Sequence, residues 1–527
     1  MKILISDNLS EKAVDIFKSK PGLECEVSTG LKPDQLKEKI KGFHALVVRS
    51  ATKVTPEILE AAENLKVIGR AGTGVDNIDV AEATKKGIVV MNTPGGNTIT
   101  TAEHAVSMML ALARNIPQAT ASMKSGKWEK KKFQGTEVTA KTLGILGVGN
   151  IGSVVASRAI GLKMNVIAYD PFISEEAADK IGITLVTMDE LFSRSDFISI
   201  HVPLTKETKN LLNKDAFKKM KKGVRIINCA RGGIVNEADL AEAIKENTVA
   251  GAAFDVFEKE PPESDNPLLA LNEAVLTPHL GASTTEAQEN VAVAVAEQIS
   301  DYLLTGTIRN AVNVPSVPAE LLASLGPYVS LGEKIGSFQG QILSGGIEEI
   351  TVEYSGDVVD FDVTSITIAC IKGLLDQVLD MYVNFVNAPL VARERGIKVV
   401  ETKSSRSTDF SSSITIKVKT KDEENLVEGA LFGKREPRIV RINQFFLDAV
   451  PEGFLLLLNN EDKPGVIGNV GMLLADNKIN IARLHLGRQA VGGGAVSVWN
   501  IDTPLSKGLI EKILKLPSII SARLIKL

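Results

Sequence analysis

Short apolar runs alternate with amphipathic stretches along the first 94 residues. Runs of four to eight apolar residues bounded by turn residues are typical of strands, and apolar positions spaced three or four apart are typical of helices. The pattern therefore predicts a βα repeat. The predicted strands are 2–7, 25–29, 44–50, 65–72 and 88–94, and the predicted helices are 10–19 and 55–63.

A second βα series follows a long helical pattern at 101–116. Its six apolar runs are almost uninterrupted, as expected for parallel strands that are covered by helices on both faces. Six such strands with helices between them predict a doubly wound sheet of the dinucleotide-binding type. The predicted strands are 141–149, 164–170, 197–203, 224–230, 250–257 and 274–279.

The remaining chain contains a further helix and two more regions. The helix is predicted at 285–304, and Pro315 and Pro318 then indicate a domain boundary. Residues 319–448 show a mixed α+β pattern whose arrangement the sequence does not define. After a second boundary near Pro451, the order strand, helix, strand, strand, helix, strand is that of a ferredoxin-like module.

The size and composition fit a globular protein of several domains. The chain has 527 residues, which corresponds to three or four domains. Its 60 basic and 64 acidic side chains give no reason to expect binding to nucleic acid or to an anionic membrane. Three cysteines without metal or disulfide spacing fit a reducing cytosol, so a cytoplasmic protein without metal is expected. The sequence shows no signal-peptide core and no run of about 20 apolar residues.

A glycine-rich fingerprint lies at the start of the second series. Gly147, Gly149 and Gly152 follow a predicted strand and begin a predicted helix. Such glycines permit the tight turn, admit a pyrophosphate and let helix and strand approach closely. Asp170 ends the next strand, where an acid accepts hydrogen bonds from ribose hydroxyls and repels a 2′-phosphate. We therefore predict an NAD site, with Asn150 and Ile151 as contacts at the helix start.

Three polar residues follow later strands of the same sheet: Arg231, Glu260 and His279. Ligands of open α/β sheets bind beyond the carboxyl ends of the strands. There, Arg231 can hold a carboxylate by two hydrogen bonds, and His279 can remove a hydroxyl proton while hydride leaves. An acid beside His279 would favour the protonated imidazole, although spacing alone does not choose among Glu258, Glu260 and Glu263.

At these motifs the chain resembles the D-isomer-specific 2-hydroxyacid dehydrogenases. The resemblance covers almost the whole chain and is carried by VVRSATKVT, GRAGTGVDNID, NTPGGNT, GILGVGNIG, NCARGGIVNE, FDVFEKEPP and TPHLGAST. It implies an α/β fold in which a Rossmann-like NAD domain is inserted into a flavodoxin-like substrate domain, followed by an α+β intervening domain and a ferredoxin-like ACT domain. The implied boundaries are 1–97 with 283–315, then 98–282, 316–450 and 451–527.

The resemblance also implies roles for individual residues. It makes Arg231, Glu260 and His279 the catalytic set, which selects Glu260 among the three acids. It implies substrate contacts from Arg49, Ser50 and Asn97 in addition to Arg231 and His279. The implied NAD contacts are Thr73, Gly147, Gly149, Asn150, Ile151, Gly152, Asp170, Val202, Cys229, Ala230, Arg231, Asp255, His279, Leu280, Gly281 and Ala282.

The C-terminal regions imply regulation. Asn460, Asp462 and Asn480 match positions that bind serine in related enzymes, so L-serine is a candidate effector, although the usual histidine is replaced by Asn460. The third region holds Lys434, Arg435, Arg438 and Arg441, either an anion site or a solvated basic face. A lysine-rich run at 124–132 lies where the family forms its dimer interface, and the resemblance implies a homodimer or homotetramer.

Three functions are compared on this basis. The leading one is NAD-dependent oxidation of 3-phosphoglycerate to 3-phosphohydroxypyruvate, the first step of the phosphorylated route to L-serine. A second is reduction of another 2-oxo acid, such as hydroxypyruvate or glyoxylate, against which Arg49, Ser50 and the C-terminal regions argue. The third is an NAD-sensing scaffold without turnover, which the amino-acid-binding type of C-terminal module disfavours.

Overall fold

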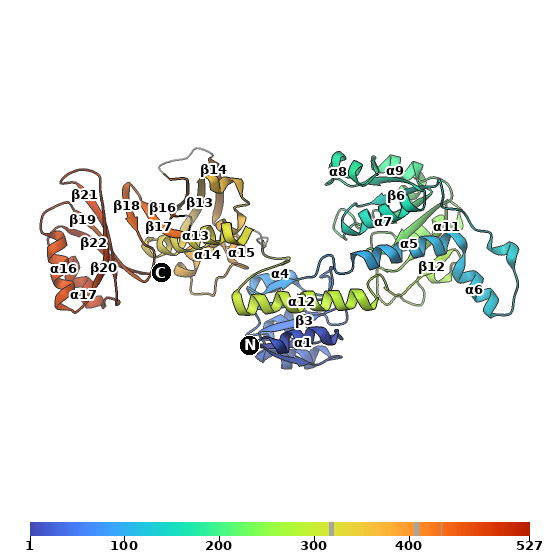
Figure 1. Ribbon diagram of the computed structural model, residues 1–527, viewed down its shortest axis with the longest axis horizontal. Coiled ribbons are helices and arrows are strands. Elements are labelled where there is room, and N and C mark those ends of the chain that lie inside the picture. Colours follow the sequence, from blue (N-terminus) through green and yellow to red (C-terminus); the bar gives the residue numbers. More distant parts are fainter. Residues whose placement is uncertain (316–320, 405–409, 434) are drawn as a thin grey trace.

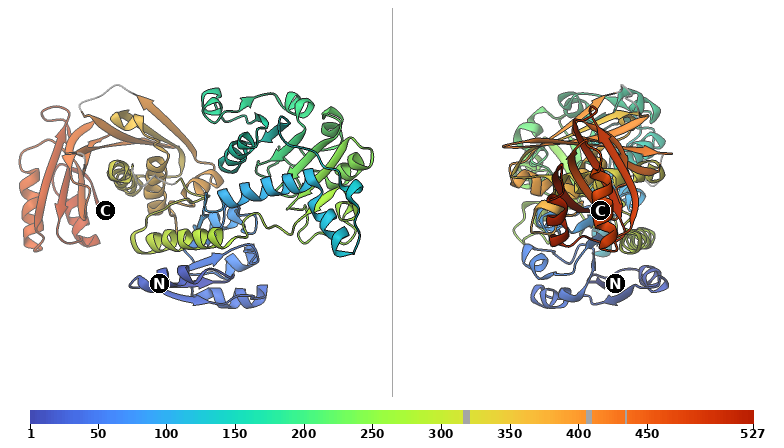
Figure 2. Two further views of the ribbon diagram at one scale, coloured as in Figure 1. Left: turned by 45° about the vertical axis from the view of Figure 1, so that its right-hand side comes forward. Right: turned by 90° about the vertical axis from the view of Figure 1, so that its left-hand side faces the viewer.

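The computed structural model describes residues 1–315, 321–404, 410–433 and 435–527. It contains four sheets, each with its own helices. In Figure 1 the two C-terminal sheets and the second sheet lie toward opposite ends of the molecule, with the N-terminal sheet at the bottom between them, and Figure 2 shows the same parts from two other sides. Pro318, Lys434 and the predicted division at residue 316 lie outside the described residues. No helix in the described part of the chain is both long and apolar enough to cross a membrane.

The first lobe is a five-stranded parallel sheet in the order β2-β1-β3-β4-β5, which is the flavodoxin order. All five predicted strands are present, and the short β5 carries the chain to the second lobe. Its elements are β1 Lys2–Ile5, α1 Glu11–Ser19, β2 Glu24–Val27, α2 Pro33–Lys39, the 3₁₀ turn Ile40–Gly42, β3 Ala45–Val48, α3 Pro56–Ala61, β4 Val67–Arg70, α4 Val80–Lys85 and β5 Val89–Met91.

The second lobe is a seven-stranded parallel sheet in the order β12-β11-β10-β9-β6-β7-β8. The first six in chain order follow the dinucleotide-binding arrangement 3-2-1-4-5-6. Its elements are α5 Thr98–Arg114, α6 Ile116–Lys124, the 3₁₀ turn Lys130–Phe133, β6 Thr142–Leu146, α7 Asn150–Gly161, β7 Asn165–Tyr169, α8 Glu175–Lys180, β8 Thr184–Leu185, α9 Met188–Arg194, β9 Phe197–Ile200, α10 Lys214–Lys219, β10 Val224–Asn228, α11 Glu237–Lys245, β11 Val249–Phe254, the 3₁₀ turn Pro267–Ala270 and β12 Ala274–Leu276.

Two details of the second lobe differ from the sequence prediction. The sheet has seven strands instead of six, because the two-residue β8 contains no apolar run that would reveal it. The helix predicted at 101–116 begins earlier, at Thr98, and is interrupted at Asn115, whose left-handed backbone (φ 53°) ends α5 and starts α6. Residues 116–133, here called the α6 arm, therefore project from the lobe (Figure 1).

The chain returns to the first lobe through α12 Thr285–Thr305. Val291, Val295 and Ile299 of this helix are buried in the same apolar cluster as Ile3 and Val47 of the first sheet. The second lobe is thus inserted into the first, as predicted. The chain therefore passes between the lobes twice, before α5 and before α12.

The third domain packs α13, α14 and α15 on one face of a six-stranded sheet in the order β14-β13-β15-β16-β17-β18. Only the β13–β14 pair is parallel, and β14 is an edge strand. The elements are α13 Leu322–Ile342, β13 Ile347–Gly356, the 3₁₀ turn Asp357–Asp360, α14 Thr364–Val378, α15 Ala388–Glu394, β14 Lys398–Ser404, β15 Ser412–Thr420, β16 Glu424–Phe432, β17 Glu436–Ile442 and β18 Phe445–Ala449.

The C-terminal module has the predicted ferredoxin-like order. Its antiparallel sheet runs β20-β21-β19-β22, and Val470, Leu474, Leu509 and Ile513 anchor two helices to one face through a buried cluster that includes Trp499. The elements are β19 Phe454–Glu461, α16 Val466–Asp476, β20 Ile481–Arg488, β21 Gly494–Ile501, α17 Lys507–Leu514 and β22 Ile519–Lys526.

Candidate functional site

The glycine fingerprint forms the turn between β6 and α7. Gly147 has a left-handed backbone (φ 89°), and a Cβ there would lie 2.7 Å from the carbonyl oxygen of His201. A Cβ on Gly152 would overlap the carbonyl of Gly147, so only glycine permits this approach of helix and strand. At Gly149 the same position is open, with no atom within 4 Å. The loop thus leaves free space before the N-terminus of α7, which fits a pyrophosphate.

Asp170 lies directly after β7, beside this loop. Its carboxylate accepts hydrogen bonds from the backbone N–H of Val148 at 2.7 Å and of Phe172 at 2.8 Å. These bonds tie the end of β7 to the glycine loop and fix the carboxylate at the rim of the open space. An acid held there fits a ribose with free hydroxyls, as NAD has.

The other predicted contacts follow β9, β10 and β11 at the same edge of the sheet. Val202 lies against Gly147, since a Cβ on that glycine would come within 2.8 Å of the valine Cγ1. Cys229 is buried beside Asp255, and burial raises the pKa of its thiol, so it is held as a neutral side chain. Ala230 donates its backbone N–H to Asn228 Oδ1 at 3.1 Å. Each residue lines the open edge without offering a reactive group.

Asp255 holds the turn that carries His279. Its carboxylate accepts from Leu280 N at 2.7 Å, Gly281 N at 2.8 Å and Thr277 Oγ1 at 2.6 Å, and it lies 3.2 Å from His104 Nε2. Burial alone would raise the pKa of this carboxyl, but the bonds, led by that from His104, lower it. The aspartate is therefore ionised, and it ties α5 to the turn after β12.

His279 and Glu260 form a hydrogen-bonded pair. His279 Nδ1 lies 2.7 Å from Glu260 Oε2, and Glu260 Oε1 accepts from Phe257 N at 3.1 Å. The pair raises the pKa of His279, chiefly through the hydrogen bond with the carboxylate. Burial works to raise the pKa of Glu260, but the hydrogen bond from His279 and its charge lower it. Of the three acids in this loop, Glu260 is the one whose carboxylate is hydrogen-bonded to the imidazole, whereas the carboxylate of Glu263 accepts from Lys259.

The backbone of His279 is fixed by the turn after β12, and its imidazole lies close enough to Arg231 to feel that charge. The residue has a left-handed conformation (φ 55°), and its N–H donates to Asp255 O at 2.9 Å. Because Glu260 occupies Nδ1, Nε2 remains for a ligand, and the side chain is about half exposed. His201, by contrast, is only partly exposed, with its Nε2 2.8 Å from Ser199 Oγ, and desolvation lowers its pKa to about 4. His201 is therefore a structural residue, as predicted.

Arg231 connects the two lobes. It follows β10 of the second lobe, yet its Nε donates to Asp76 Oδ2 of the first lobe at 3.0 Å, and its Nη1 donates to Ala230 O at 2.7 Å. A Cβ on Gly74 would overlap this guanidinium, so the glycine is needed for the approach. The cation therefore lies between the lobes with one nitrogen, Nη2, still available.

The residues predicted to contact substrate follow strands of the first lobe. Arg49 comes directly after β3; its backbone N–H donates to Asp7 Oδ2 at 2.6 Å, and its Nη1 to Asn8 O at 3.1 Å. Ser50 is exposed beside it. Asn97 stands at the start of α5, where its Oδ1 accepts from Thr73 Oγ1 at 2.8 Å. Thr73 is thus positioned by Asn97 at the connection between the lobes.

Sequence reasoning missed Arg70, the last residue of β4. Its Nε is buried without a hydrogen-bond partner, and its guanidinium fills the space that Gly72 leaves free of a side chain. Burial lowers the pKa of Arg70 to about 10, and the positive charges of Arg231 and Arg49 add to this effect. Three arginines thus influence one another at the cleft. The signal was present in the motif GRAGTG, where a cation ends a strand before two glycines.

The three predicted regulatory residues do not meet within one chain. Asn460 pairs with Ala495 at one end of the fourth sheet, whereas Asn480 precedes Ile481, which pairs with Ile501 at the other end. Six residues of strand separate these ends, or roughly 20 Å at about 3.3 Å per residue. Asp462 accepts from Arg488 Nη1 at 2.9 Å. A site that uses all three residues therefore needs two chains.

Two arginines of the third-domain basic cluster are already bonded to neighbouring residues. Arg438 is paired with Glu436 at 2.8 Å and Asp448 at 3.2 Å, and Arg441 donates to Asn443 O at 2.7 Å. This favours a structural role over an anion site for the third-domain cluster.

In the α6 arm, Trp128 is 80% exposed, and Ile116 and Met123 are about half exposed. Such apolar exposure beside lysines is typical of an interface.

Comparison with known proteins gives matches to two family models and to relatives of full length. Residues 106–281 match the model described as D-isomer specific 2-hydroxyacid dehydrogenase, NAD binding domain. Residues 324–443 match the model described as D-3-phosphoglycerate dehydrogenase intervening domain. The chain is 47% identical to a D-3-phosphoglycerate dehydrogenase of Archaeoglobus fulgidus, with 100% of both chains covered. It is 46% identical to the Synechocystis protein of that name, covering 100% of this chain and 95% of the relative.

Solved structures match the first two lobes. A D-lactate dehydrogenase from Aquifex aeolicus, solved with NAD and lactic acid, has a TM-score of 0.53 and 27% sequence identity. The match covers 60% of this chain and 100% of that one. This share is consistent with a likeness confined to the two lobes, with the third domain and the C-terminal module as additions.

Proposed function

Because this chain belongs to the D-3-phosphoglycerate dehydrogenases, within the D-isomer specific 2-hydroxyacid dehydrogenase family, we propose that it oxidises 3-phospho-D-glycerate to 3-phosphohydroxypyruvate with NAD. This is the first step of the phosphorylated route to L-serine. The observation that carries the proposal is the His279–Glu260 pair, whose imidazole lies close enough to Arg231 to feel its charge, as does Arg70, which also feels Arg49. A proton acceptor beside such a group of cations suits an alcohol that bears an anionic tail.

The proposed proton step uses the free nitrogen of His279. Neutral His279 accepts the C2 hydroxyl proton at Nε2, while Glu260 stabilises the imidazolium that forms. The cofactor, held by the glycine loop, Asp170 and the turn after His279, supplies the hydride acceptor. In the reverse direction the imidazolium returns the proton to the carbonyl oxygen.

The charges of the substrate match the arginines. Arg231 offers Nη2 to the carboxylate beside C2, and we propose that Arg49 and Arg70 bind the phosphate, with Ser50 and Asn97 as neutral donors. Arg49 lies at the rim and Arg70 is partly buried. We therefore expect Arg49 to contribute mainly to phosphate affinity, and Arg70 to contribute to the shape of the site as well.

The first experiment compares 3-phosphoglycerate with D-glycerate as substrates for NAD reduction. Arg49→Ala should raise KM for 3-phosphoglycerate at least tenfold and leave kcat/KM for D-glycerate within about threefold, because a lost charge-assisted bond costs about 1.5–3 kcal/mol. Arg194→Ala is the matched control, because this arginine ends α9 ahead of β9 and not at the carboxyl end of a strand. Equal losses on both substrates would refute the phosphate assignment.

A second variant tests the base. His279→Ala should lower kcat about 10²- to 10⁴-fold, as expected for loss of a general base, while NAD binding measured by fluorescence quenching stays near the wild-type value. Near-normal turnover would remove His279 from the proton step. Turnover absent in the wild type, with NAD still bound, would favour a sensing function instead.

We further propose that the chain forms a homo-oligomer through the α6 arm. The exposed Trp128, Met123 and Ile116 support this, since water-exposed apolar side chains of this size are usually covered. Light scattering of Trp128→Glu should show a smaller assembly than the wild type. An unchanged mass would place the interface elsewhere.

A further inference from the structure

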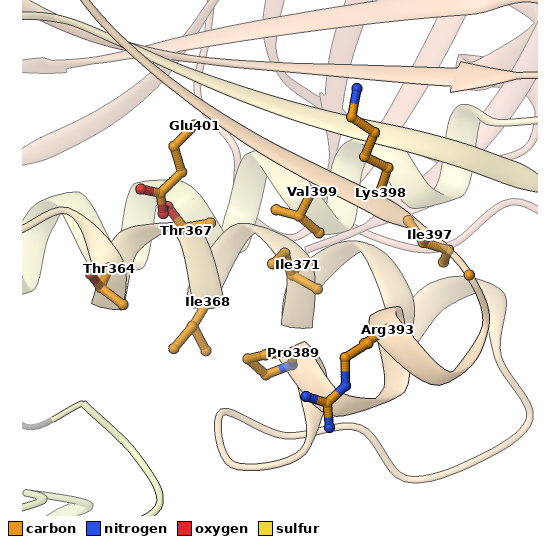
Figure 3. A pocket seen from close by; sticks show the side chains of 11 residues that line it. Thr364, Thr367, Ile368, Ile371, Pro389, Arg393, Ile397, Lys398, Val399 and Glu401 are labelled. Atoms are coloured by element: carbon orange, nitrogen blue, oxygen red, sulfur yellow. The ribbon is translucent and has the colours of Figure 1, made fainter. Parts of the chain in front are cut away.

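The third domain contains a cavity of about 530 Å³ that takes no part in the proposed reaction. It lies where α14 and α15 pass beneath the edge strand β14 (Figure 3). Since β14 pairs only with β13, its outer side is open among the described residues. A volume of this size is typical of small-molecule sites in proteins.

The floor of the cavity is apolar. Ile368 and Ile371 of α14 and Ile397 before β14 are each less than 10% exposed, and Val399 of β14 is 36% exposed. Figure 3 shows Ile368, Ile371 and Val399 around the same space as Pro389. Because Ile397, Val399 and Glu401 alternate along the strand, they share the side that faces the helices. An occupant would therefore lay an apolar body against these residues.

One cation at the mouth of the cavity has no partner. Arg393 of α15 lines the cavity, and its side chain makes no hydrogen bond or ion pair within the described residues. The other lysine or arginine of the lining, Lys398, is paired with Glu349 at 2.9 Å. An unpaired guanidinium beside apolar walls attracts a carboxylate that carries an apolar body.

The opposite end of the cavity repels a second negative charge. Glu401 accepts a hydrogen bond from Thr367, whose hydroxyl also lies 2.6 Å from Tyr354 OH. Figure 3 places Glu401 and Thr367 away from Arg393, with the apolar residues between them. A ligand with two anionic ends, such as a phosphorylated hydroxy acid, would bring one of them to Glu401. Arg393 at one end and Glu401 at the other therefore favour a ligand with a single carboxylate.

We propose that this cavity binds an apolar monocarboxylate, with its carboxylate on Arg393 and its body on the isoleucine floor, and that occupancy is transmitted to the first lobe through α15. The site lies outside the cleft between the lobes, and binding to it does not depend on which hydroxy acid the protein oxidises.

The route of transmission starts with the segment before α15. Asn384 Nδ2 donates to Gly87 O of the first lobe at 2.8 Å, and Val386 is buried in the apolar cluster of that lobe. Gly87 has no room for a side chain beside Asn384. It directly precedes Ile88 and β5, which leads to Asn97 at the connection between the lobes. A shift of α15 is therefore felt at the strand that precedes the substrate contacts.

The binding experiment uses the full chain and octanoate as the probe, measured by calorimetry. Octanamide, which has the same apolar body without charge, should bind at least tenfold more weakly than octanoate. Arg393→Gln should weaken octanoate by at least tenfold, about 1.4 kcal/mol, and Arg395→Gln, two residues away and outside the lining, should stay within twofold of wild type. Equal affinity for the acid and the amide, an unaffected Arg393→Gln, or no saturable binding would overturn the site.

The coupling experiment measures KM for the hydroxy acid with and without saturating octanoate. Octanoate should change KM at least twofold in the wild type. Asn384→Ala should abolish that change while leaving the octanoate Kd within twofold, since Asn384 is not in the cavity lining. No change of KM in the wild type, or the same change in Asn384→Ala, would overturn the transmission through α15. If the hydroxy acid is not oxidised at all, the calorimetry still decides whether octanoate binds in this cavity.

Discussion

Replacing Glu260 by Gln tests how the carboxylate acts on His279. The change removes one negative charge and keeps one oxygen, which can accept from His279 Nδ1, while the amide nitrogen takes the place of the oxygen that accepts from Phe257 N. The imidazole should therefore keep its orientation. What is lost is the stabilisation of the imidazolium, which forms only as the hydroxyl proton is taken.

The size of the effect follows from the geometry of the pair. A charge-assisted hydrogen bond contributes about 1.5–3 kcal/mol. The His279 and Glu260 side chains are 48% and 38% exposed, so solvent screening places the pair at the lower end of that range. A loss of about 1.4 kcal/mol corresponds to a tenfold lower rate. We therefore expect kcat for oxidation to fall about tenfold at pH values where His279 is neutral.

The pH dependence of both reactions should show in which direction the substitution moves the pKa of His279. Oxidation needs neutral His279, so its rate falls as pH drops through the pKa of the histidine. Glu260 raises that pKa, and Glu260→Gln should therefore move the acid limb of oxidation to lower pH. Reduction needs the imidazolium, so its basic limb should move to lower pH as well. Both limbs shift in the same direction because one group titrates in both reactions.

The assay is kcat/KM against pH in both directions, for wild type and variant. Titration of the substrate phosphate is common to both proteins and cancels in their ratio. Glu263→Gln is the matched control, because this acid lies in the same loop but contacts Lys259 instead of His279. Limbs that stay in place, or that move in opposite directions, would refute the assignment of Glu260.

Two further variants test the cleft and the cofactor loop. Arg70→Met keeps a side chain of similar length without the charge and should raise KM for 3-phosphoglycerate by more than tenfold. The melting temperature should be no lower than that of wild type, because a partly buried cation whose Nε has no hydrogen-bond partner is removed. An unchanged KM would exclude Arg70 from the phosphate site. Gly152→Ala places a Cβ against the Gly147 carbonyl and should weaken NAD binding at least tenfold by calorimetry, whereas Gly161→Ala, where the space is open, should not; equal affinities would show that the close approach is not needed.

The elements that could be predicted are those with strong local signals. The glycine fingerprint, the nearly continuous apolar strands and the five histidines each limit the fold or the site without any contact information. His279 was found because the predicted strand 274–279 ends at it, whereas His201 fell inside the predicted strand 197–203. In the structure β9 ends at Ile200, directly before His201, so it is the contact of His201 with Ser199 that separates the two histidines. The strand β8 was missed because two residues, Thr184 and Leu185, carry no periodicity.

The cross-lobe contacts could not be predicted from spacing. Asp76 and Arg231 are 155 residues apart, and their pairing depends on how the inserted lobe faces the first one. The role of His104 is similar: its helical pattern gave no sign that it would reach from α5 to Asp255. The third domain was left undefined because the parallel pair β13–β14 is formed across two helices, which no local pattern reveals.

The ion pair between Asp76 and Arg231 explains how three arginines coexist before substrate binds. Arg231 and Arg49 each disfavour the charge on Arg70, while Asp76 offsets this repulsion. Asp76 is 72% exposed, so its pair with Arg231 is worth about 0–1 kcal/mol and is easily exchanged. A substrate carboxylate that reaches both Nε and Nη2 in a closed cleft gains more, because its bonds are bidentate and less screened. We therefore expect Asp76 to hold Arg231 between the lobes at low cost and to release it to a substrate carboxylate when the lobes close.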